Sequence, residues 1–262
     1  MTNHRFWGEL ARKLTKAAVL VRTRRFRRGL LAGVAAGIEH EELLRGLGGV
    51  RTVVDVGANK GQFALLALEL FPDATVHAFE PLAAAFARLG TWSRREHRLM
   101  CHCLALAETA GMQVMHVSAR LDSSSLHPIT QRQTTQFPHT HEVREEWVRV
   151  GRLDETLTAM DLPAPALLKI DVQGGELEVL RGAAGVLSCF DWVYVECSFV
   201  EFYQGQGLVA DVAGLLGDAG FEATVFWRPC RDTAGHPVQA DVLFTRRSPI
   251  GPIKHDHDAV QT

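Results

Sequence analysis

Residues 53–63, Val-Val-Asp-Val-Gly-Ala-Asn-Lys-Gly-Gln-Phe, predict a strand, a sharp turn and the start of a helix. The apolar run indicates a buried parallel strand that ends near Asp55. Gly57 permits the tight turn that must follow, because glycine adopts backbone dihedral angles closed to other residues. Gly61 keeps the following helix close to the sheet. Such a unit builds a cofactor pocket beyond the carboxyl end of its strand.

The spacing of the glycines argues against a dinucleotide as that cofactor. A pyrophosphate-binding turn reads G-x-G-x-x-G, and its second glycine lets the phosphates approach the backbone. Here Asn59 places a side chain at that point, and Asp55 adds a negative charge that repels phosphate. An NAD-linked enzyme is therefore the weaker alternative. The other alternative is that the segment binds no cofactor and is an ordinary strand–turn–helix unit in which the asparagine caps the helix.

A second acid follows about one strand–helix unit later. Residues 77–81, His-Ala-Phe-Glu-Pro, predict the end of the next strand, with the carboxylate of Glu80 at its tip. An acid at this distance along the chain is placed to bind the two hydroxyls of a ribose. Two acids and a glycine turn suit S-adenosylmethionine, which has a ribose, an ammonium and a sulfonium but no phosphate.

The composition is that of a soluble globular protein. The 262 residues are 47% hydrophobic and 22% charged, with a net charge of −2, which argues against nucleic acid as a partner. The five cysteines show neither zinc spacing nor a disulfide pattern, and no cleavable signal or membrane-spanning apolar run is present. These features predict a cytoplasmic protein.

The N-terminal 45 residues are expected to form a basic helical extension. Arginines and lysines alternate with apolar residues over the first thirty positions, a pattern typical of amphipathic helices. Two roles are open: a helical cap with a solvated basic face, or peripheral contact with an anionic membrane surface. Residues 247–262 have little apolar content and are expected to be a flexible tail.

The order of elements predicts an α/β fold. Strands and helices alternate along the chain, and a strand hairpin closes it, which indicates a doubly wound, mostly parallel sheet with one antiparallel strand. The polar segment 119–140 is expected to be a long functional loop. The expected strands are 53–56, 74–79, 99–106, 166–171, 192–196, 222–227 and 240–244, with 111–117 and 148–150 as further short elements.

Four acids are expected at one edge of this sheet. Each follows or ends a predicted parallel strand, and ligands of such sheets bind beyond the carboxyl ends of the strands. Carboxylates gathered in a cleft repel one another and resist burial, so the group needs a cationic cofactor, a polyol or a metal as its partner. A divalent cation such as Mg²⁺ is one of these possibilities. The four acids are Asp55, Glu80, Asp171 and Glu196.

These segments together resemble the FkbM family of methyltransferases. The motifs are the 54–61 turn, Phe-Glu-Pro at 79–81, and the block from Leu168 to Ala183 that reads Leu-Lys-Ile-Asp-Val-Gln-Gly-Gly-Glu and onward. The resemblance runs from about residue 50 to 244. It implies a class I, Rossmann-like methyltransferase domain over residues 46–246, with 119–140 as the substrate-side loop. It also implies transfer of a methyl group from S-adenosylmethionine to a hydroxyl oxygen.

The resemblance also implies roles for single residues. Glu80 would hold the ribose hydroxyls, Leu104 and Ala105 would border the adenine, and Asp171 would line the methyl-transfer site. Glu176 would orient the turn behind Asp171. The remaining residues expected around the cofactor are Asp55, Gly57, Asn59, Gly61 and Phe63.

Methylation of a hydroxyl benefits from a general base, for which the sequence offers two kinds of candidate. Asp171 and Glu196 have the more dependable position, at strand ends. Histidine exchanges a proton nearer neutral pH, which favours His127, His139 or His141 on the long loop. The sequence does not separate these candidates.

The sequence is compatible with three functions. The first is O-methylation of a sugar or glycoconjugate, the second is O-methylation of a polyketide or other small natural product, and the third is a noncatalytic cofactor-binding module. The expected partner is a small-molecule or saccharide acceptor, and a homo-oligomer is compatible with the sequence.

Overall fold

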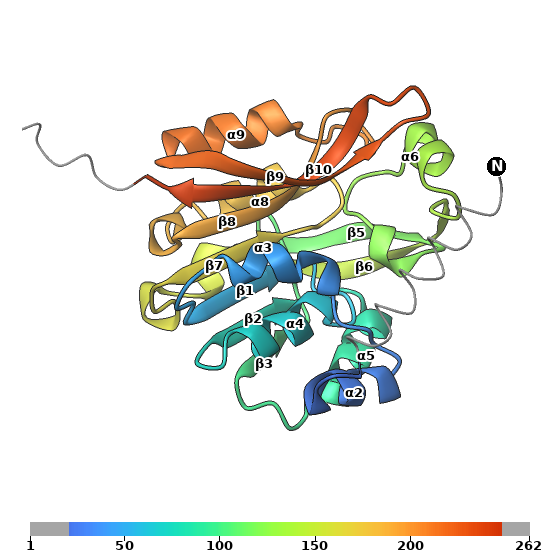
Figure 1. The fold of residues 1–262 in the computed structure, drawn as a ribbon. Helices are drawn as coiled ribbons and strands as arrows, with labels where there is room; N and C mark the ends of the chain where they lie inside the picture. The colour runs from blue at the N-terminus through green and yellow to red at the C-terminus, as the bar shows by residue number, and fades with distance from the viewer. Residues whose placement is uncertain (1–20, 248–262) are drawn as a thin grey trace, which may run out of the picture.

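The structure is a computed structural model, which describes residues 21–247. Its centre is a seven-stranded sheet with the order β3-β2-β1-β7-β8-β10-β9 (Figure 1). β10 is antiparallel to both of its neighbours, and the other paired strands run parallel. The expected class I methyltransferase fold with one antiparallel strand is therefore confirmed. The strands are β1 Thr52–Val56, β2 Thr75–Phe79, β3 Leu99–His102, β7 Ala166–Ile170, β8 Trp192–Ser198, β9 Phe221–Arg231 and β10 Pro237–Arg246.

Helices cover both faces of this sheet (Figure 1). On one face, α4 packs on β1 and β2 and is covered in turn by α2 and α3; on the other, α8 and α9 pack on β8. Successive residues of β1 point to opposite faces of the sheet. Val53 packs in the hydrophobic core on one face and Val54 in the core on the other, as expected for a strand covered on both sides. The helices are α2 Arg24–Leu31, α3 Glu41–Arg45, α4 Gln62–Leu70, α5 Ala83–Ser93, α7 Leu153–Thr156, α8 Glu176–Gly182 and α9 Val209–Asp218.

A second, three-stranded sheet lies beside the main one and was not expected from the sequence. It pairs β6 Glu142–Gly151 with β5 Gly111–Ser118 and with the short β4 Ala105–Leu106. Most of β6 is exposed over residues 142–147, so this segment carries no apolar alternation that would predict a strand. The predicted element at 148–150 is only the buried end of a ten-residue strand.

The segment expected as a loop at 119–140 connects β5 to β6 and is partly ordered by local structure. It contains the 3-10 helix Leu121–Ser123 and the helix α6 Gln131–Gln136, which the Thr130 side chain caps. The hydroxyl of Tyr203, in the segment after β8, lies 3.1 Å from the carbonyl oxygen of Ser123 and so ties the two segments together. The segment is therefore held against the main sheet.

Some arginines in the described part of the N-terminal extension form ion pairs with the rest of the domain. Arg25 pairs with Glu69 and Glu96, and Arg28 also pairs with Glu96. These contacts join α2 to α4 and to the turn after α5, and they fit a helical cap on the domain. The basic residues before position 21 and the tail after 247 lie outside the described residues. Within 21–247, no helix is long and apolar enough to cross a membrane.

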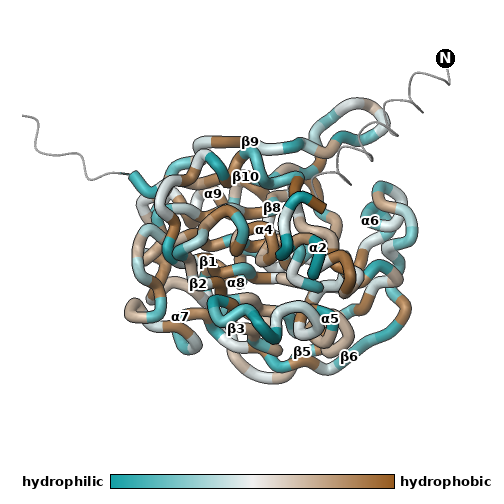
Figure 2. Tube along the Cα trace, turned by 60° about the horizontal axis from the view of Figure 1, so that its bottom comes forward, coloured by the Kyte–Doolittle hydropathy of each residue, from teal (hydrophilic) through white to brown (hydrophobic). Residues whose placement is uncertain are grey.

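Hydropathy follows this layering. In Figure 2 the chain is mostly hydrophobic where the strands run through the middle of the molecule and mostly hydrophilic in the outer turns. β1 and β7 are buried over their whole length. The charged side chains on these two strands, Asp55 and Lys169, are therefore exceptional in this core, and they lie next to the candidate site.

Candidate active site

A cavity of about 430 Å³ opens beyond the carboxyl ends of β1, β2 and β7. It is lined by the turn after β1, the residues that follow β2, strand β4, part of the 121–127 segment, the turn after β7 and the N-terminal residues 37–40. Residues expected at the cofactor that do line it are Gly57, Asn59, Phe63, Glu80, Leu104, Ala105 and Asp171. The ligand edge predicted from the strand ends is thus a real cavity.

The glycine turn is shaped by its packing. Gly57 has φ +78°, and a Cβ there would overlap the backbone oxygen of Asp171 in the neighbouring turn. Gly61 has φ +86°, and its Cβ would lie 2.6 Å from the ring of Trp92 in α5. Both positions therefore need glycine for conformation and for space. Gly61 lets α5 approach the turn, whereas the sequence predicted an approach of its own helix to the sheet.

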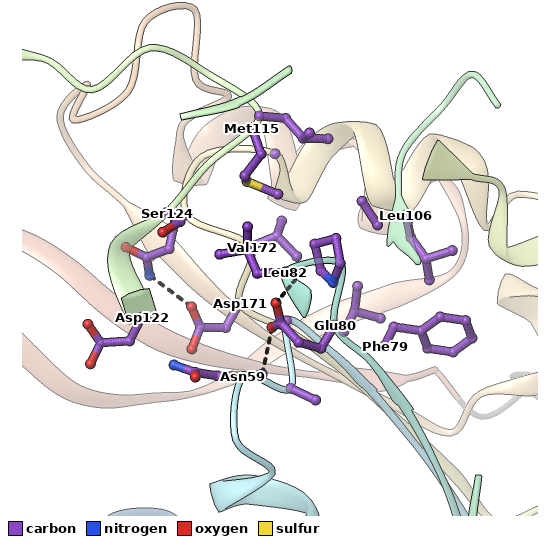
Figure 3. A pocket seen from close by; sticks show the side chains of 18 of the residues that line it. Asn59, Phe79, Glu80, Leu82, Leu106, Met115, Asp122, Ser124, Asp171 and Val172 are labelled. Atoms are coloured by element: carbon purple, nitrogen blue, oxygen red, sulfur yellow. Dashed lines mark hydrogen bonds between the residues drawn. The ribbon is translucent and has the colours of Figure 1, made fainter. Parts of the chain in front are cut away.

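Glu80 is a buried carboxylate with both oxygens fixed by backbone donors. The amide of Asn59 donates to Oε2 at 2.9 Å, and the amide of Leu82 donates to Oε1 at 2.8 Å (Figure 3). Burial raises the pKa of Glu80 to about 7, against the lowering effect of these two hydrogen bonds. Each oxygen keeps a free lone pair. The Oδ1 atom of Asn59 is also buried and has no hydrogen-bond partner among the described residues.

Asp55 does not line the cavity, which corrects the expectation that it faces the cofactor. Its side chain is fully buried within the sheet, and Oδ1 lies 3.0 Å from the Nζ atom of Lys169 on the adjacent strand β7. Lys169 also lies 3.7 Å from Oδ2 of Asp171 and donates to the carbonyl of Gly57. Burial opposes the ammonium charge, but attraction by Asp55 and Asp171 exceeds that effect and raises the pKa of Lys169.

Lys169 lines the cavity and is a candidate site residue that the sequence analysis does not single out. In the sequence it is only one residue of the motif that resembles the family. The available signal was a lysine between Leu168 and Ile170 in an apolar strand, since a lysine there needs a partner inside the protein.

Asp171 stands on the cavity wall and is held by Gln173. The amide nitrogen of Gln173 donates to Asp171 Oδ1 at 2.9 Å and to Glu196 Oε2 at 2.7 Å. Its amide oxygen accepts from the hydroxyl of Tyr203 at 2.7 Å. Gln173 has φ +61°, so the turn is bent to bring this amide between the two carboxylates. Asp171 therefore has a fixed orientation toward the cavity.

Glu196 lies behind Gln173 and does not line the cavity, which corrects its prediction as a catalytic candidate. Burial, followed by repulsion from Asp171, raises the pKa of Glu196 well above its usual value. Of the four acids expected together, only Glu80 and Asp171 reach the cavity. Glu176 accepts hydrogen bonds from the amides of Val172 and Gly174 and so orients the turn, as the resemblance implied.

Of the three histidines predicted as possible bases on the 119–140 segment and just after it, one lines the cavity and two do not. His127 lines the cavity, with Nδ1 at 3.0 Å from the carbonyl of Gln204 and Nε2 at 3.8 Å from Glu178 Oε1. His139 and His141 are exposed and do not line it, which corrects their prediction as bases. Both follow α6 on the side of the segment that leads into β6, and the sequence did not reveal that helix.

The N-terminal segment contributes residues to the cavity that the sequence did not predict. Glu39 and His40 line it, and the backbone amide of Gly37 donates to the carbonyl of Gln62 at the start of α4. The Nδ1 atom of His40 lies 2.9 Å from the hydroxyl of Tyr194 on β8. Nothing in the local sequence signals this placement, because it depends on how the segment folds back over α4.

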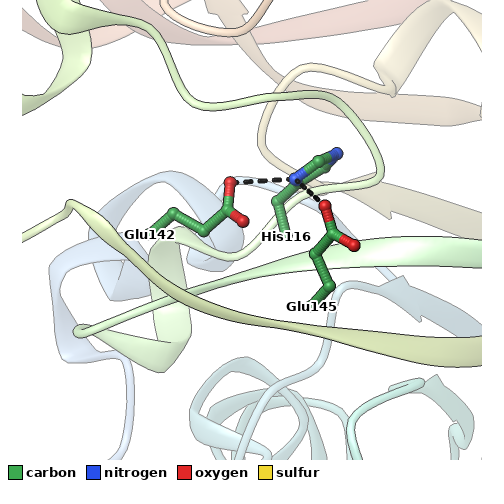
Figure 4. A group of neighbouring side chains, drawn as sticks. All are labelled: His116, Glu142 and Glu145. Carbon is green, nitrogen blue, oxygen red and sulfur yellow. Dashed lines mark hydrogen bonds and ion pairs between the residues drawn. The ribbon is translucent and has the colours of Figure 1, made fainter.

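The cavity acids do not form a metal site. Among residues 21–247, one group has metal-ligand spacing, and it lies on the small sheet: His116, Glu142 and Glu145 (Figure 4). His116 Nδ1 lies 2.9 Å from Glu142 Oε2 and 4.0 Å from Glu145 Oε1, and both glutamates are exposed. None of the three lines the cavity. The Mg²⁺ ion that the sequence left open as one possibility at the strand ends is therefore not supported. The charge of Lys169 already pairs with Asp55 and Asp171, and the amides of Gln173 and of the backbone donate hydrogen bonds to the other two acids.

Comparison with known proteins agrees with this geometry. The model of the methyltransferase FkbM domain matches residues 55–223, which is more than half of the chain. The chain is 32% identical to the 31-O-demethyl-FK506 methyltransferase FkbM of Streptomyces tacrolimicus, over 64% of this chain and 72% of that protein. It is 27% identical to the 2-O-methyltransferase NoeI of Sinorhizobium fredii, over 63% and 70%.

A third relative is the hexuronic acid methyltransferase AglP of Haloferax volcanii, 31% identical over 54% of each protein. The matched region contains the glycine turn, Glu80, Lys169 and the Asp171 turn, which together line or support the cavity. This chain therefore belongs to the FkbM family of S-adenosylmethionine-dependent methyltransferases.

Proposed function

We propose that this methyltransferase transfers a methyl group to a hydroxyl oxygen of a sugar or glycoconjugate. The observation that carries the proposal is the carboxylate of Asp171, fixed by Gln173 on the wall of a cavity that is rich in polar side chains. A hydroxyl acceptor needs such a group to receive its proton. An acceptor with several hydroxyls finds further hydrogen-bond partners in the same cavity.

Different lining residues of the cavity are suited to bind the ribose, the adenine and the amino-acid part of S-adenosylmethionine. Glu80 would accept hydrogen bonds from the two ribose hydroxyls through its free lone pairs. Leu104 and Ala105 would border the adenine. The unpartnered Oδ1 of Asn59 fits an ammonium donor, because a buried amide oxygen without a hydrogen bond is unfavourable. Gly57 and Phe63 would shape the wall around the methionine, whereas Gly61, which does not line the cavity, lies behind it against Trp92.

The acceptor would lie at the Asp171 end of this cavity. In Figure 3, Asp122 and Ser124 lie on the same side as Asp171, and Leu106 lies at the opposite side. Gln173 and His127 line the cavity too. Carboxylate, hydroxyl, amide and imidazole groups in one region favour a polyhydroxylated acceptor over an apolar one.

The cofactor supplies an activated methyl group, and the chain positions the acceptor and removes its proton. Holding the acceptor oxygen in line with the methyl carbon contributes on the order of 7–11 kcal/mol to lowering the barrier. Asp171 takes the hydroxyl proton as the new carbon–oxygen bond forms, which adds about 10²–10⁴-fold in rate. The ammonium of Lys169 lies 3.7 Å from Oδ2 of Asp171, and Gln173 keeps the carboxylate turned toward the acceptor.

The relatives support both acceptor classes that the sequence left open. AglP is named for a hexuronic acid, which favours the sugar, whereas the FkbM relative is named for demethylated FK506, which favours a polyketide. Leu121 and Leu126 also line the cavity and would suit the apolar part of a polyketide. A polyketide or other small natural product is therefore the second candidate acceptor.

A labelled-methyl transfer screen tests the proposal. Purified protein is incubated with methyl-labelled S-adenosylmethionine and two panels of acceptors, one of saccharides and glycolipids and one of polyketides, with Mg²⁺ or with EDTA. The proposal expects label on an oxygen of a saccharide, at the same rate with either addition. Label confined to the polyketide panel would favour the second candidate, and label on nitrogen or carbon would contradict both.

A further inference from the structure

His40 sits at a junction of three distant parts of the chain. It belongs to the segment before α3, it faces Tyr194 on β8, and its Nδ1 lies 3.7 Å from Oδ2 of Asp241 on β10. Tyr194 and Asp241 are themselves hydrogen-bonded. Positions 40 and 241 both lie outside the region matched by the family model. The arrangement is thus a feature of this chain that the family assignment does not explain.

The ring of His40 is fixed by its surroundings. It meets Phe63 edge-on with ring centroids 5.6 Å apart, and it meets Tyr194 in the same way at the same distance. The segment that carries it is held from both sides: Gly37 donates to Gln62, and the indole of Trp227 donates to the backbone carbonyl of Glu39 at 3.1 Å. A histidine so constrained on a cavity wall presents one ring nitrogen in a defined direction.

That nitrogen is Nε2, because Tyr194 occupies Nδ1. Burial lowers the pKa of His40 to about 4, so the ring is neutral near neutral pH and carries one proton. The hydroxyl of Tyr194 has a single hydrogen, which it gives either to Asp241 or to Nδ1 of His40. When Nδ1 accepts, the ring proton is on Nε2, and Nε2–H is a hydrogen-bond donor. An anion beside Nε2 favours this arrangement.

One anionic group of the cofactor needs such a donor. The amino-acid end of S-adenosylmethionine has a carboxylate, and in the placement proposed above it would lie away from Leu104, on the side of Phe63 and Asp171. Most charged groups of the described cavity wall are acids, and its one lysine, Lys169, already serves Asp55 and Asp171. His40 lies beside Phe63, so its donor is close to this end of the cavity.

We infer that His40, with its Nδ1 accepting from the hydroxyl of Tyr194, donates a hydrogen bond from Nε2 to the carboxylate of the cofactor's methionine. The N-terminal segment is then part of the cofactor site rather than only a cap. The inference rests on the placement of the cofactor given under the proposed function. If the inference holds, binding of the amino-acid end of the cofactor depends on His40. Binding of the adenosine end does not depend on His40.

Two ligands separate these ends. S-adenosylhomocysteine contains the amino acid, and 5′-methylthioadenosine has the same adenine, ribose and sulfur without it. Isothermal titration of the full chain measures both affinities for the wild type and for His40→Phe, which keeps an aromatic ring against Phe63. We expect S-adenosylhomocysteine to bind about 10- to 100-fold more weakly to the variant, as loss of a hydrogen bond to a charged group predicts. The affinity for 5′-methylthioadenosine should change by less than about twofold.

Further variants complete the test. His40→Gln, whose amide can replace the Nε2 donor, should recover part of the affinity, and the exposed His97→Phe should bind both ligands as the wild type does. Equal loss for both ligands, or no loss for either, would overturn the inference. Failure of the wild type to bind S-adenosylhomocysteine would instead overturn the proposed cofactor site itself. Retained binding of 5′-methylthioadenosine also serves as the check that each variant is folded.

Discussion

Lys169 and Asp55 form an ion pair of 3.0 Å between two adjacent strands of the main sheet, and neither side chain is more than 8% exposed. The pair connects the stability of the sheet to the active site, because the same ammonium lies 3.7 Å from Asp171 at the cavity wall. A lysine inside a sheet is tolerated only with such partners. Its effect on stability and on Asp171 can therefore be measured separately.

Removal of one partner of this pair should strongly destabilise the fold. Lys169→Met leaves the Asp55 carboxylate buried without a cation, which is expected to lower the free energy of unfolding by about 3–5 kcal/mol. The double variant Asp55→Asn with Lys169→Met should lose clearly less than the sum of the single variants. Urea denaturation measures these values. Glu146→Gln, which breaks the exposed pair with Arg144, is the control and should cost less than about 1 kcal/mol. Additive losses in the double variant would mean that the two side chains do not interact.

Glu80 should couple cofactor binding to pH. Its pKa of about 7 lies above the usual 4.5, so in the free protein its protonated form contributes stability that is lost as the pH rises through about 7. Ribose hydroxyls donate to the ionised form, so binding releases a proton below about pH 7. The affinity for S-adenosylhomocysteine should therefore rise between pH 5.5 and 7.5, by up to about tenfold per unit, and then level off.

Glu80→Gln is the variant that isolates this effect. It should bind S-adenosylhomocysteine more weakly, and this pH dependence should disappear. Calorimetry at several pH values, in buffers that differ in ionisation enthalpy, measures the affinity and the released proton. An unchanged pH dependence in the variant would show that another group is responsible.

Gly61 should not tolerate a side chain. Gly61→Ala combines an unfavourable positive φ with a close approach to Leu89 and Trp92, and is expected to cost about 2–5 kcal/mol. Gly90→Ala in α5 is the matched control, because a Cβ there meets no atom within 4 Å. That change should stabilise the protein by about 0.5–1 kcal/mol. Equal unfolding free energies for the two variants would contradict the packing described for the glycine turn.

The amide of Gln173 should reduce the repulsion between the carboxylates of Asp171 and Glu196, because it donates a hydrogen bond to each of them. Gln173→Glu replaces the shared amide donor with a third negative charge between Asp171 and Glu196. The variant should be less stable than the wild type by about 1–3 kcal/mol at pH 8 and by much less at pH 5, where carboxylates take up protons. Thermal unfolding at the two pH values measures this difference, with Gln131→Glu on the exposed face of α6 as the control. A deficit that does not depend on pH would contradict the bridging role.

The sequence predicted the parts of the fold where local pattern and burial agree. β1, β2, β7 and β8 are apolar runs that end near acids, and their order along the chain indicated the parallel sheet. β6 was largely missed because its first half is exposed and therefore has no apolar alternation. The same limit applied to α6, a short polar helix whose ordering depends on capping by Thr130 and on the hydrogen bond from Gln133 to Tyr203 in the segment after β8.

The candidate site was predictable to the extent that strand ends determine it. Glu80 and Asp171 were placed correctly because the residues at the ends of parallel strands share one edge of the sheet. Asp55 and Glu196 were expected to face the same cavity, but Lys169 and Gln173 cover them. His40 could not have been found, since its position depends on contacts with β8 and β10 that no local pattern encodes. Tertiary pairing thus decided which of the polar residues became part of the site.

In the proposed reaction, Asp171 receives the proton of the hydroxyl during methyl transfer to its oxygen. The most direct measurement compares the wild type with Asp171→Asn, using labelled S-adenosylmethionine and the acceptor found in the screen, while calorimetry follows S-adenosylhomocysteine binding. We expect the variant to bind S-adenosylhomocysteine still and its turnover to fall by about 10²–10⁴-fold. Full turnover of Asp171→Asn on that acceptor would show that Asp171 is not the base.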